Sequence, residues 1–394
     1  MATTATTRRR AKAAFTLALV PLLLSTACSK GSDTGAASPA AGGSASAAAG
    51  DCPQALTAAK AAVAKARDTS PKWTGPTTGP KAQAGKTVVY VAADLTNPGV
   101  KGVADAVQEA GKAIGWQVRV IDGQGSPAGQ QAAFSQALAL KPAGVVVGGF
   151  DPKTTQSQLD QANSTGVIVV GWHAVGAPGA STDPKMFNNV TTKVDDVSEI
   201  SAQWIIAKSN GSGGVVVFTD ASIPFAKGKS DSLVTDLQKC SSIKVLTTEN
   251  IPIPDAAART PQEVSTLIGQ YGEKWTFSVA INDLYFDNAA PALRAAGRKG
   301  DGPPFNVGAG DGSAAAFQRI RSGQYQAATV PEPLSEQGWQ IVDELNRGIA
   351  GKPPTDYYAP VHVTDSTNAE AGSIYDPQNG YRDIYKKIWA SGGS

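Results

Sequence analysis

Residues 87–93 read Thr-Val-Val-Tyr-Val-Ala-Ala, an apolar, β-rich run that is typical of a strand buried on both faces. Directly after it, Val100, Val103, Val107 and Ile114 recur at the spacing of an amphipathic helix. A buried strand followed by such a helix is the repeating unit of a parallel sheet that is covered by helices on both faces.

The same alternation continues along the chain. Further strands are predicted at 116–121, 144–148, 167–172, 214–219, 243–248, 277–282, 305–308 and, more briefly, 358–363. Helices are predicted at 129–140, 154–162, 197–208, 229–239, 261–271, 288–296, 313–321 and 337–346. Two successive arrays of similar size predict an α/β protein with two lobes, each a doubly wound parallel sheet.

The N-terminus indicates export. Arg8, Arg9, Arg10 and Lys12 precede the apolar run 13–24, which is too short to remain as a membrane span. Residues 1–27 are therefore expected to be a signal peptide. The sequence Leu-Ser-Thr-Ala-Cys that ends at Cys28 resembles a bacterial lipobox, although Ser25 stands where Leu is usual. It predicts lipidation of Cys28, and an ordinary signal peptide with a chance cysteine is the alternative.

Residues 28–85 are interpreted as a lipid-anchored flexible linker with an accessory helix. Residues 30–50 are almost entirely Ala, Gly, Ser, Thr and Pro, which cannot bury enough apolar surface to offset chain ordering. Low-complexity filler is the alternative. An Ala-rich helix is predicted at 57–66, and Trp73 with the Gly/Pro cluster at 75–85 forms a strap after it.

Charge and cysteine content restrict the partners. Removing residues 1–27 takes away four of the 35 basic residues and none of the 33 acidic ones, so the remaining charge is 31 − 33 = −2. Without a basic patch, nucleic acid is not expected as a partner.

Cys52 and Cys240 either pair in a disulfide or remain as two buried thiols. A metal site is not expected, because the only histidines are His173 and His362.

Several short motifs at the predicted strand ends resemble those of the ribose-binding protein and its periplasmic sugar-binding relatives. The likeness covers about residues 86–364. The motifs are Asp94-Leu-Thr-Asn97-Pro98, Ile121-Asp-Gly-Gln124, Val167-Ile-Val-Val-Gly-Trp172-His173, Ala280-Ile-Asn282-Asp283, Val307-Gly-Ala-Gly-Asp311-Gly312 and Gly323-Gln-Tyr-Gln-Ala-Ala-Thr329 with Gln337-Gly338. The resemblance implies a first lobe of 86–189 plus 333–360 and a second lobe of 190–332 plus 361–394. A three-segment hinge is expected near 189, 330–333 and 361.

Ligands of open α/β sheets bind beyond the carboxyl ends of the strands, where these motifs lie. The residues expected to bind a ligand are Asn97, Gln124, Trp172, His173, Lys227, Asn282, Asp283, Tyr285, Asp311 and Glu332. Amides and carboxylates can bond to vicinal hydroxyls, and aromatic faces can cover the apolar side of a sugar ring.

The chain departs from these relatives within the site. Gly99 and Val100 stand where the relatives have stacking aromatic residues, and Trp172-His173 replaces an Asp-Arg pair. Lys227 takes the place of an arginine, and Glu332 that of a glutamine. A sugar or polyol is still the expected ligand, but a simple pentose does not follow from the resemblance.

Each site residue also has a structural interpretation. Asn282 and Asp311 could only cap helices, and Trp172 could only pack within its lobe. His173 could be a hydrogen-bonded structural residue, and Glu332 could serve hinge geometry. Phe225, Tyr285 and Phe286 are more often core residues, and of these only Tyr285 was retained as a candidate.

The expected function is that of an extracytoplasmic, membrane-anchored, monomeric solute-binding lipoprotein of an ABC importer, with the permease and ATPase as partners. No cofactor is expected, and no catalysis, because neither histidine belongs to a nucleophile or metal motif. The alternatives are a receptor that presents its ligand to a signalling partner, a binder of a non-sugar molecule, and a secreted hydrolase.

Overall fold

The computed structural model describes residues 52–369 and 374–391, all within one structural unit, Ala47–Ser394. The expected signal peptide, Cys28 and most of the linker lie outside the described residues.

The apolar run at 87–93 forms the second strand in the order of the first sheet. β1 (Thr87–Ala92) pairs in parallel with β2 on one side and β3 on the other, residue by residue from Thr87↔Gln117 and Val88↔Gly144. The strand order is β2-β1-β3-β4-β6-β5, in which β5 pairs antiparallel to β6. The other strands of this sheet are β2 (Gln117–Asp122), β3 (Gly144–Gly148), β4 (Ile168–Trp172), β5 (Gly179–Thr182) and β6 (Lys185–Val190).

Helices cover both faces of this sheet. Asn97 begins α2 by accepting hydrogen bonds from the backbone of Gly99 and Val100, and Gly115 ends it with a φ of 82°, a conformation that favours glycine. The helices of the first lobe are α2 (Pro98–Ile114), α3 (Pro127–Ala139), the 3₁₀ turn η1 (Pro152–Thr155), α4 (Gln156–Ser164), α10 (Leu334–Ile349) and α11 (Tyr381–Ser391).

The second sheet has the order β12-β11-β10-β9-β7-β8, and only β12 pairs antiparallel to its neighbour. Its strands are β7 (Gly213–Thr219), β8 (Ile243–Asn250), β9 (Trp275–Ala280), β10 (Phe305–Gly308), β11 (Ala328–Thr329) and β12 (Thr364–Asp365). Its helices are α5 (Val194–Lys208), α6 (Pro224–Leu237), η2 (Ile253–Asp255), α7 (Ala256–Tyr271), η3 (Gly272–Lys274), α8 (Leu284–Ala295) and α9 (Ala314–Ser322).

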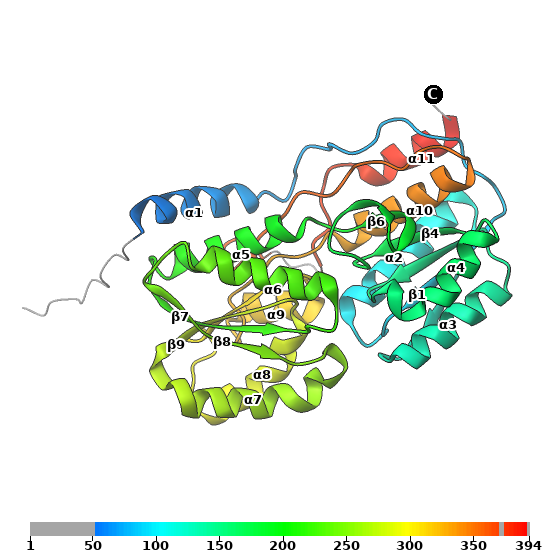
Figure 1. Ribbon diagram of the computed structural model, residues 1–394. Helices are drawn as coiled ribbons and strands as arrows, with labels where there is room; N and C mark the ends of the chain where they lie inside the picture. Colours follow the sequence, from blue (N-terminus) through cyan, green and yellow to red (C-terminus); the bar gives the residue numbers. More distant parts are fainter. Residues whose placement is uncertain (1–51, 370–373, 392–394) are drawn as a thin grey trace, which may run out of the picture. The chain divides into compact units, whose positions relative to one another are not determined.

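Strand β7 shows why this lobe has three layers. Its successive side chains point to opposite faces, so Val215 and Val217 join one apolar cluster while Val216 and Phe218 join another. Helices α5 and α6 cover the first face, and α7 and α8 cover the second (Figure 1). The continuous apolar run of the strand is therefore explained by burial on both sides.

The C-terminal segment differs from the expected lobe boundary. β12 joins the second sheet, but α11 packs in the core of the first lobe through Tyr381, Tyr385 and Trp389. In Figure 1, α11 lies beside α10, and the ring of Trp389 stacks on Trp339 with centroids 5.4 Å apart. Aromatic residues spaced along one face of α11 need an apolar partner, and α10 provides it.

The N-terminal segment joins both lobes. α1 (Pro53–Ala66) packs on the second lobe through Ala59 and Val63, and a disulfide joins Cys52 to Cys240 there. The strap that follows reaches the first lobe, where the amide of Ala82 donates to the carbonyl of Trp389. Besides the three expected hinge segments, the chain thus also passes between the lobes before β1 and again after β12.

Two strand assignments differ between the sequence prediction and the structure. The antiparallel pair β5–β6 was not predicted, because β6 contains Asn188 and Asn189 and lacks an apolar run. No strand forms at 358–363, and the nearest strand is β12 at Thr364–Asp365.

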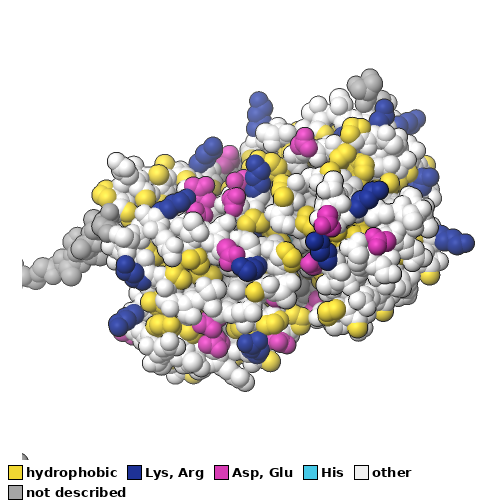
Figure 2. All heavy atoms as spheres, in the orientation of Figure 1, with side chains coloured by type: hydrophobic (Ala, Val, Ile, Leu, Met, Phe, Trp, Pro, Cys, Tyr) yellow, Lys and Arg dark blue, Asp and Glu magenta, His cyan; other side chains and the backbone are white. Residues whose placement is uncertain are grey.

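On the face that Figure 2 shows, charged side chains of both signs are interspersed over the surface.

Candidate functional site

A small cavity of about 40 Å³ lies where residues that follow strands of both sheets meet. It is lined by Asn97, Val100, Gly149, Trp172, His173, Ile223, Phe225, Ala226, Lys229, Ile253, Ile281, Asn282 and Asp311. Both lobes contribute, and each polar member comes from a strand end or from the first turns of a helix. The position is the one expected for a ligand site in sheets of this kind.

An aromatic stack crosses this cavity. Trp172 is the last residue of β4, and its ring lies 4.0 Å from the imidazole of the adjacent His173. The other face of His173 lies 4.2 Å from Phe225, which belongs to α6 in the second lobe. His173 has a φ of 49°, in the left-handed region, so its backbone is held in an unfavourable conformation. The stack brings the two lobes into contact through the imidazole.

Glu332 connects His173 to the hinge. One carboxylate oxygen of Glu332 accepts a hydrogen bond from Thr192 at 2.9 Å and lies 3.6 Å from Nε2 of His173. The other accepts from the side-chain amide of Gln337 at 2.8 Å, and Gln337 in turn accepts from the indole of Trp172 at 2.8 Å. Nε2 of His173 is buried and has no hydrogen-bond partner.

Lys229, rather than Lys227, is the cation of the cleft. Lys229 is buried, and its ammonium donates to the carbonyls of Ile281 at 3.2 Å and Ala309 at 2.6 Å. It also lies 4.7 Å from the centre of the Phe225 ring. Lys227 is exposed and pairs with Asp231 four residues later. The expected role of Lys227 is therefore wrong, because its side chain faces away from the cleft.

Three polar residues at strand ends line the cavity as expected. Asn97 and Asn282 are buried; Asn97 caps α2, and Asn282 accepts a hydrogen bond from the backbone of Leu284, the first residue of α8, at 3.2 Å. Asp311 has a φ of 63°, and its buried Oδ2 atom has no hydrogen-bond partner. A buried carboxyl oxygen without a hydrogen-bond partner is costly, so the cavity holds a polar atom whose hydrogen bonding is incomplete.

Asp283 fixes the backbone that follows Asp311. It does not line the cavity, and its Oδ2 atom accepts from the backbone of Gly312 at 2.8 Å and Ser313 at 3.1 Å. These bonds hold the turn that carries Asp311.

Two other expected residues lie elsewhere. Gln124 is exposed and does not line the cavity. Tyr285 is a core residue whose hydroxyl donates to the carbonyl of Ile251 at 2.7 Å. The structural interpretation of Tyr285 is therefore the correct one.

Phe225 and Lys229 were missed as site residues. They stand four residues apart on α6 and therefore share one face of that helix, whereas Lys227 lies on another. The helical spacing of Phe225 and Lys229 was the available signal, and it was hidden because the loop before α6 aligns loosely with the relatives.

Burial dominates the electrostatics of the cleft. Burial would raise the pKa of Glu332, but His173, Lys229 and the bond from Thr192 hold that pKa at about 2. Burial and the nearby Asp283 raise the pKa of Asp311, and Lys229 opposes this shift. Burial also raises the pKa of Asp283 to about 6. Lys229 has a lowered pKa because it is buried, and Glu332, Asp311 and Asp283 oppose the shift.

The arrangement is suited to binding. Within residues 52–369 and 374–391, no group of three or more His, Cys, Asp or Glu residues is placed to hold a metal ion. No helix of the same ranges is long and apolar enough to cross a membrane. What the cleft offers is a flat aromatic surface beside one buried ammonium, two side-chain amides and one carboxylate oxygen that lacks a donor.

Comparisons with known proteins agree with this geometry. Residues 88–353 match the model of the periplasmic binding protein domain, so the chain belongs to that family. No curated protein sequence gives a significant match to the chain.

Solved structures of the same fold share little sequence with the chain. An ABC sugar transporter subunit from Rhodobacter sphaeroides is 21% identical, with a TM-score of 0.62 over 72% of this chain and 99% of that one. A solute-binding protein from Agrobacterium vitis with bound allitol is 21% identical, with a TM-score of 0.63 over 72% and 97%. One from Bacillus halodurans with bound myo-inositol is 16% identical, with a TM-score of 0.62 over 74% and 98%.

The position of Trp172 predicts a large effect on folding. Trp172 lines the cavity, but it is also 2% exposed and packed in the core of the first lobe. Because the indole is part of that core, Trp172→Ala should destabilise the first lobe as well as alter the cavity. The substitution should lower the free energy of unfolding by about 3–5 kcal/mol in urea denaturation. Lys227→Ala, which removes an exposed side chain, is the control, and equal stability of both variants would contradict the packing role.

Two buried histidines predict acid sensitivity. His362 stacks on Tyr375 and donates from Nδ1 to the carbonyl of Asp68, and burial lowers its pKa to about 4. Burial also lowers the pKa of His173, although Glu332 opposes this. Because the unfolded chain binds these protons more readily, the free energy of unfolding should fall as the pH drops below about 6.5. The loss for His362 should reach roughly 3 kcal/mol once the pH is below the pKa of His362 in the folded protein.

Urea denaturation at about pH 7 and about pH 5 measures this effect. His362→Gln should reduce the difference between the two pH values, and His173→Gln should reduce it further. An unchanged difference in the double variant would assign the acid sensitivity to other groups.

Proposed function

We propose that this protein captures a sugar or polyol in the cleft and delivers it to an ABC importer without changing it chemically. The observation that carries the proposal is the unpaired Oδ2 atom of Asp311 beside buried Lys229 and an aromatic stack. Ligand hydroxyls can form hydrogen bonds with Asp311, and a ring can lie against an aromatic face. The allitol and myo-inositol in two related structures support the same ligand class.

Binding requires the cleft to enlarge. The cavity of about 40 Å³ is far below the roughly 300 Å³ of a typical small-molecule site. The imidazole of His173 lies between Trp172 of its own lobe and Phe225 of the second lobe, so separation of the lobes uncovers the facing sides of His173 and Phe225. We therefore propose that the ligand enters an open form and that hinge motion closes the lobes around it.

The residues proposed to contact the ligand are those that line the cavity with polar or aromatic groups. From the first lobe they are Asn97, Trp172 and His173, and from the second Phe225, Lys229, Asn282 and Asp311. Glu332 is proposed to act through His173, because it lies in the hinge and does not line the cavity.

The proposed location is the outer face of the cell membrane. We propose that residues 1–27 are removed and that Cys28 is lipidated, so that the linker tethers the binding unit near the permease. The basic head and apolar run of residues 8–24 support this proposal.

A ligand panel with two matched lysine variants tests the binding proposal. Calorimetry with allitol, myo-inositol and common hexoses should identify at least one ligand, and scattering with that ligand should show compaction. Lys229→Met should weaken binding at least about tenfold, because it removes a buried charge from the site. Lys227→Met, two residues away, should bind as the unmodified protein does. The absence of any binding in the panel would argue against this ligand class, and equal losses in both variants would argue against the proposed site.

The anchor is tested by fractionation. Cys28→Ala should prevent lipidation, so the protein should leave the membrane fraction or accumulate as an uncleaved precursor in immunoblots of fractionated cells. Cys52→Ala provides a control in which the lipidation residue is intact. Recovery of the unmodified protein in the aqueous fraction would contradict the anchor.

A further inference from the structure

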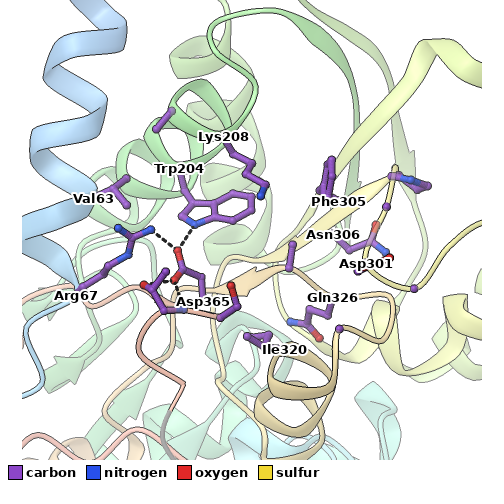
Figure 3. Close-up of a pocket in the computed structure, with 18 of the residues that line it drawn as sticks. Val63, Arg67, Trp204, Lys208, Asp301, Phe305, Asn306, Ile320, Gln326 and Asp365 are labelled. Carbon is purple, nitrogen blue, oxygen red and sulfur yellow. Dashed lines mark hydrogen bonds and ion pairs between the residues drawn. The ribbon is translucent and has the colours of Figure 1, made fainter. Parts of the chain in front are cut away.

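A second cavity of about 420 Å³ lies in the second lobe, at the end of the sheet opposite the cleft. Phe305 and Asn306, which begin β10, line it, whereas Asp311 follows the other end of that strand. Figure 3 shows side chains from α1, α5 and the loop before β10 that surround this space. Its volume falls within the range of small-molecule sites, roughly 300–1,000 Å³.

Segments that the family domain does not include complete this cavity. The family match ends at residues 88 and 353, yet α1, Arg67 and the turn Asp365–Thr367 form one wall. α1 is held in place by the disulfide at Cys52 and by Val63 in the core. The cavity is therefore completed by segments that lie outside residues 88–353.

An ion pair fixes that wall. Asp365 accepts hydrogen bonds from Arg67 and, at 2.9 Å, from the indole of Trp204 (Figure 3). Its other oxygen accepts from the amide and hydroxyl of Thr367 at 3.0 Å and 2.6 Å. Although burial opposes it, these bonds lower the pKa of Asp365, so the carboxylate stays charged. Asp365 thus has its full set of donors and serves to position Arg67 and Trp204.

The remaining charge of the cavity is positive. Lys60 and Lys208 line it, and neither has a carboxylate partner among the described residues. The Lys208 ammonium lies 5.1 Å from the centre of the Phe305 ring, and that of Lys60 lies 3.5 Å from the amide oxygen of Asn210. Apart from Asp365, Asp301 is the one lining carboxylate, so two ammonium groups without a carboxylate partner share the cavity with one further carboxylate.

The walls between these charges are largely apolar. Val63, Trp204, Ile320 and Pro304 are buried, and the ring of Phe305 faces the same space (Figure 3). Such a site suits a small molecule with one anionic group and a compact body. Lysine ammonium groups bind phosphate as point charges.

We propose that this cavity is a second binding site, for a compact ligand that carries a phosphate group. A soluble phosphate monoester and the headgroup of an anionic phospholipid share this chemistry. The lining residues of this site differ from those of the cleft.

Fluorine NMR of the full-length chain labelled with 5-fluorotryptophan tests the proposal, with Trp204→Phe used to assign the Trp204 signal. Titration with glycerol 3-phosphate should shift that signal in a saturable way. The double substitution Lys60→Gln, Lys208→Gln should abolish the shift or weaken the affinity at least about tenfold. Both lysines are exposed, so the double variant should fold, which circular dichroism verifies. Lys244→Gln, at an exposed lysine outside the cavity, should leave the shift unchanged.

A second titration with vesicles of phosphatidylcholine, with and without phosphatidylglycerol, distinguishes the two sources. A lysine-dependent shift with glycerol 3-phosphate alone assigns the site to a soluble ester. A shift that requires phosphatidylglycerol assigns it to a headgroup. No shift with either probe, or a shift that survives loss of both lysines, would overturn the proposal.

Discussion

The buried carboxylate of Glu332 connects the hinge, the cleft and both lobes. It lies in one of the segments that pass between the lobes, accepts from Thr192 in another, and accepts from Gln337 on α10. A buried charge is costly unless it is matched, and here Lys229 supplies the opposite charge while Thr192 and Gln337 donate hydrogen bonds to the carboxylate. Loss of one partner of such a cluster typically costs about 3–5 kcal/mol, so the identities of these residues are interdependent.

This cluster explains why the first lobe presents Trp172 and His173 at the end of β4. Trp172 is fixed by its bond to Gln337, and Gln337 is fixed by Glu332, so the aromatic stack and the hinge share one hydrogen-bonded chain. Lys229 enters the same environment from the second lobe. A continuous chain of hydrogen bonds thus links the aromatic stack to the hinge segment.

The central strands of both sheets could be predicted because their signal is local. The run at 144–148 matches β3 residue for residue, since a strand buried on both faces is apolar throughout. β6 could not be predicted in this way, because Asn189 in that strand bonds to the carbonyls of Val175 and Ala177 in a neighbouring turn. The placement of α11 depended on a partner helix far away in sequence, and no local pattern identifies that partner.

The polar residues at strand ends were predicted because topology alone brings them together. Lys229 was missed, since the choice between Lys227 and Lys229 depends on the rotation of α6 about its axis. For Trp172, the sequence could not distinguish between two environments. The sequence allowed either a site residue or a core residue, and the structure places the indole both in the lining of the cavity and in the core of the first lobe.

The disulfide between Cys52 and Cys240 has a mechanical consequence. A force that pulls on the chain before Cys52 is transmitted to the second lobe through this disulfide. It acts there on Cys240, which follows the C-terminal end of α6. The strap that leads from α1 to the first lobe therefore does not carry this force. The hinge segments do not carry it either. A pull from the N-terminal side moves the second lobe as a body and does not pry the two lobes apart.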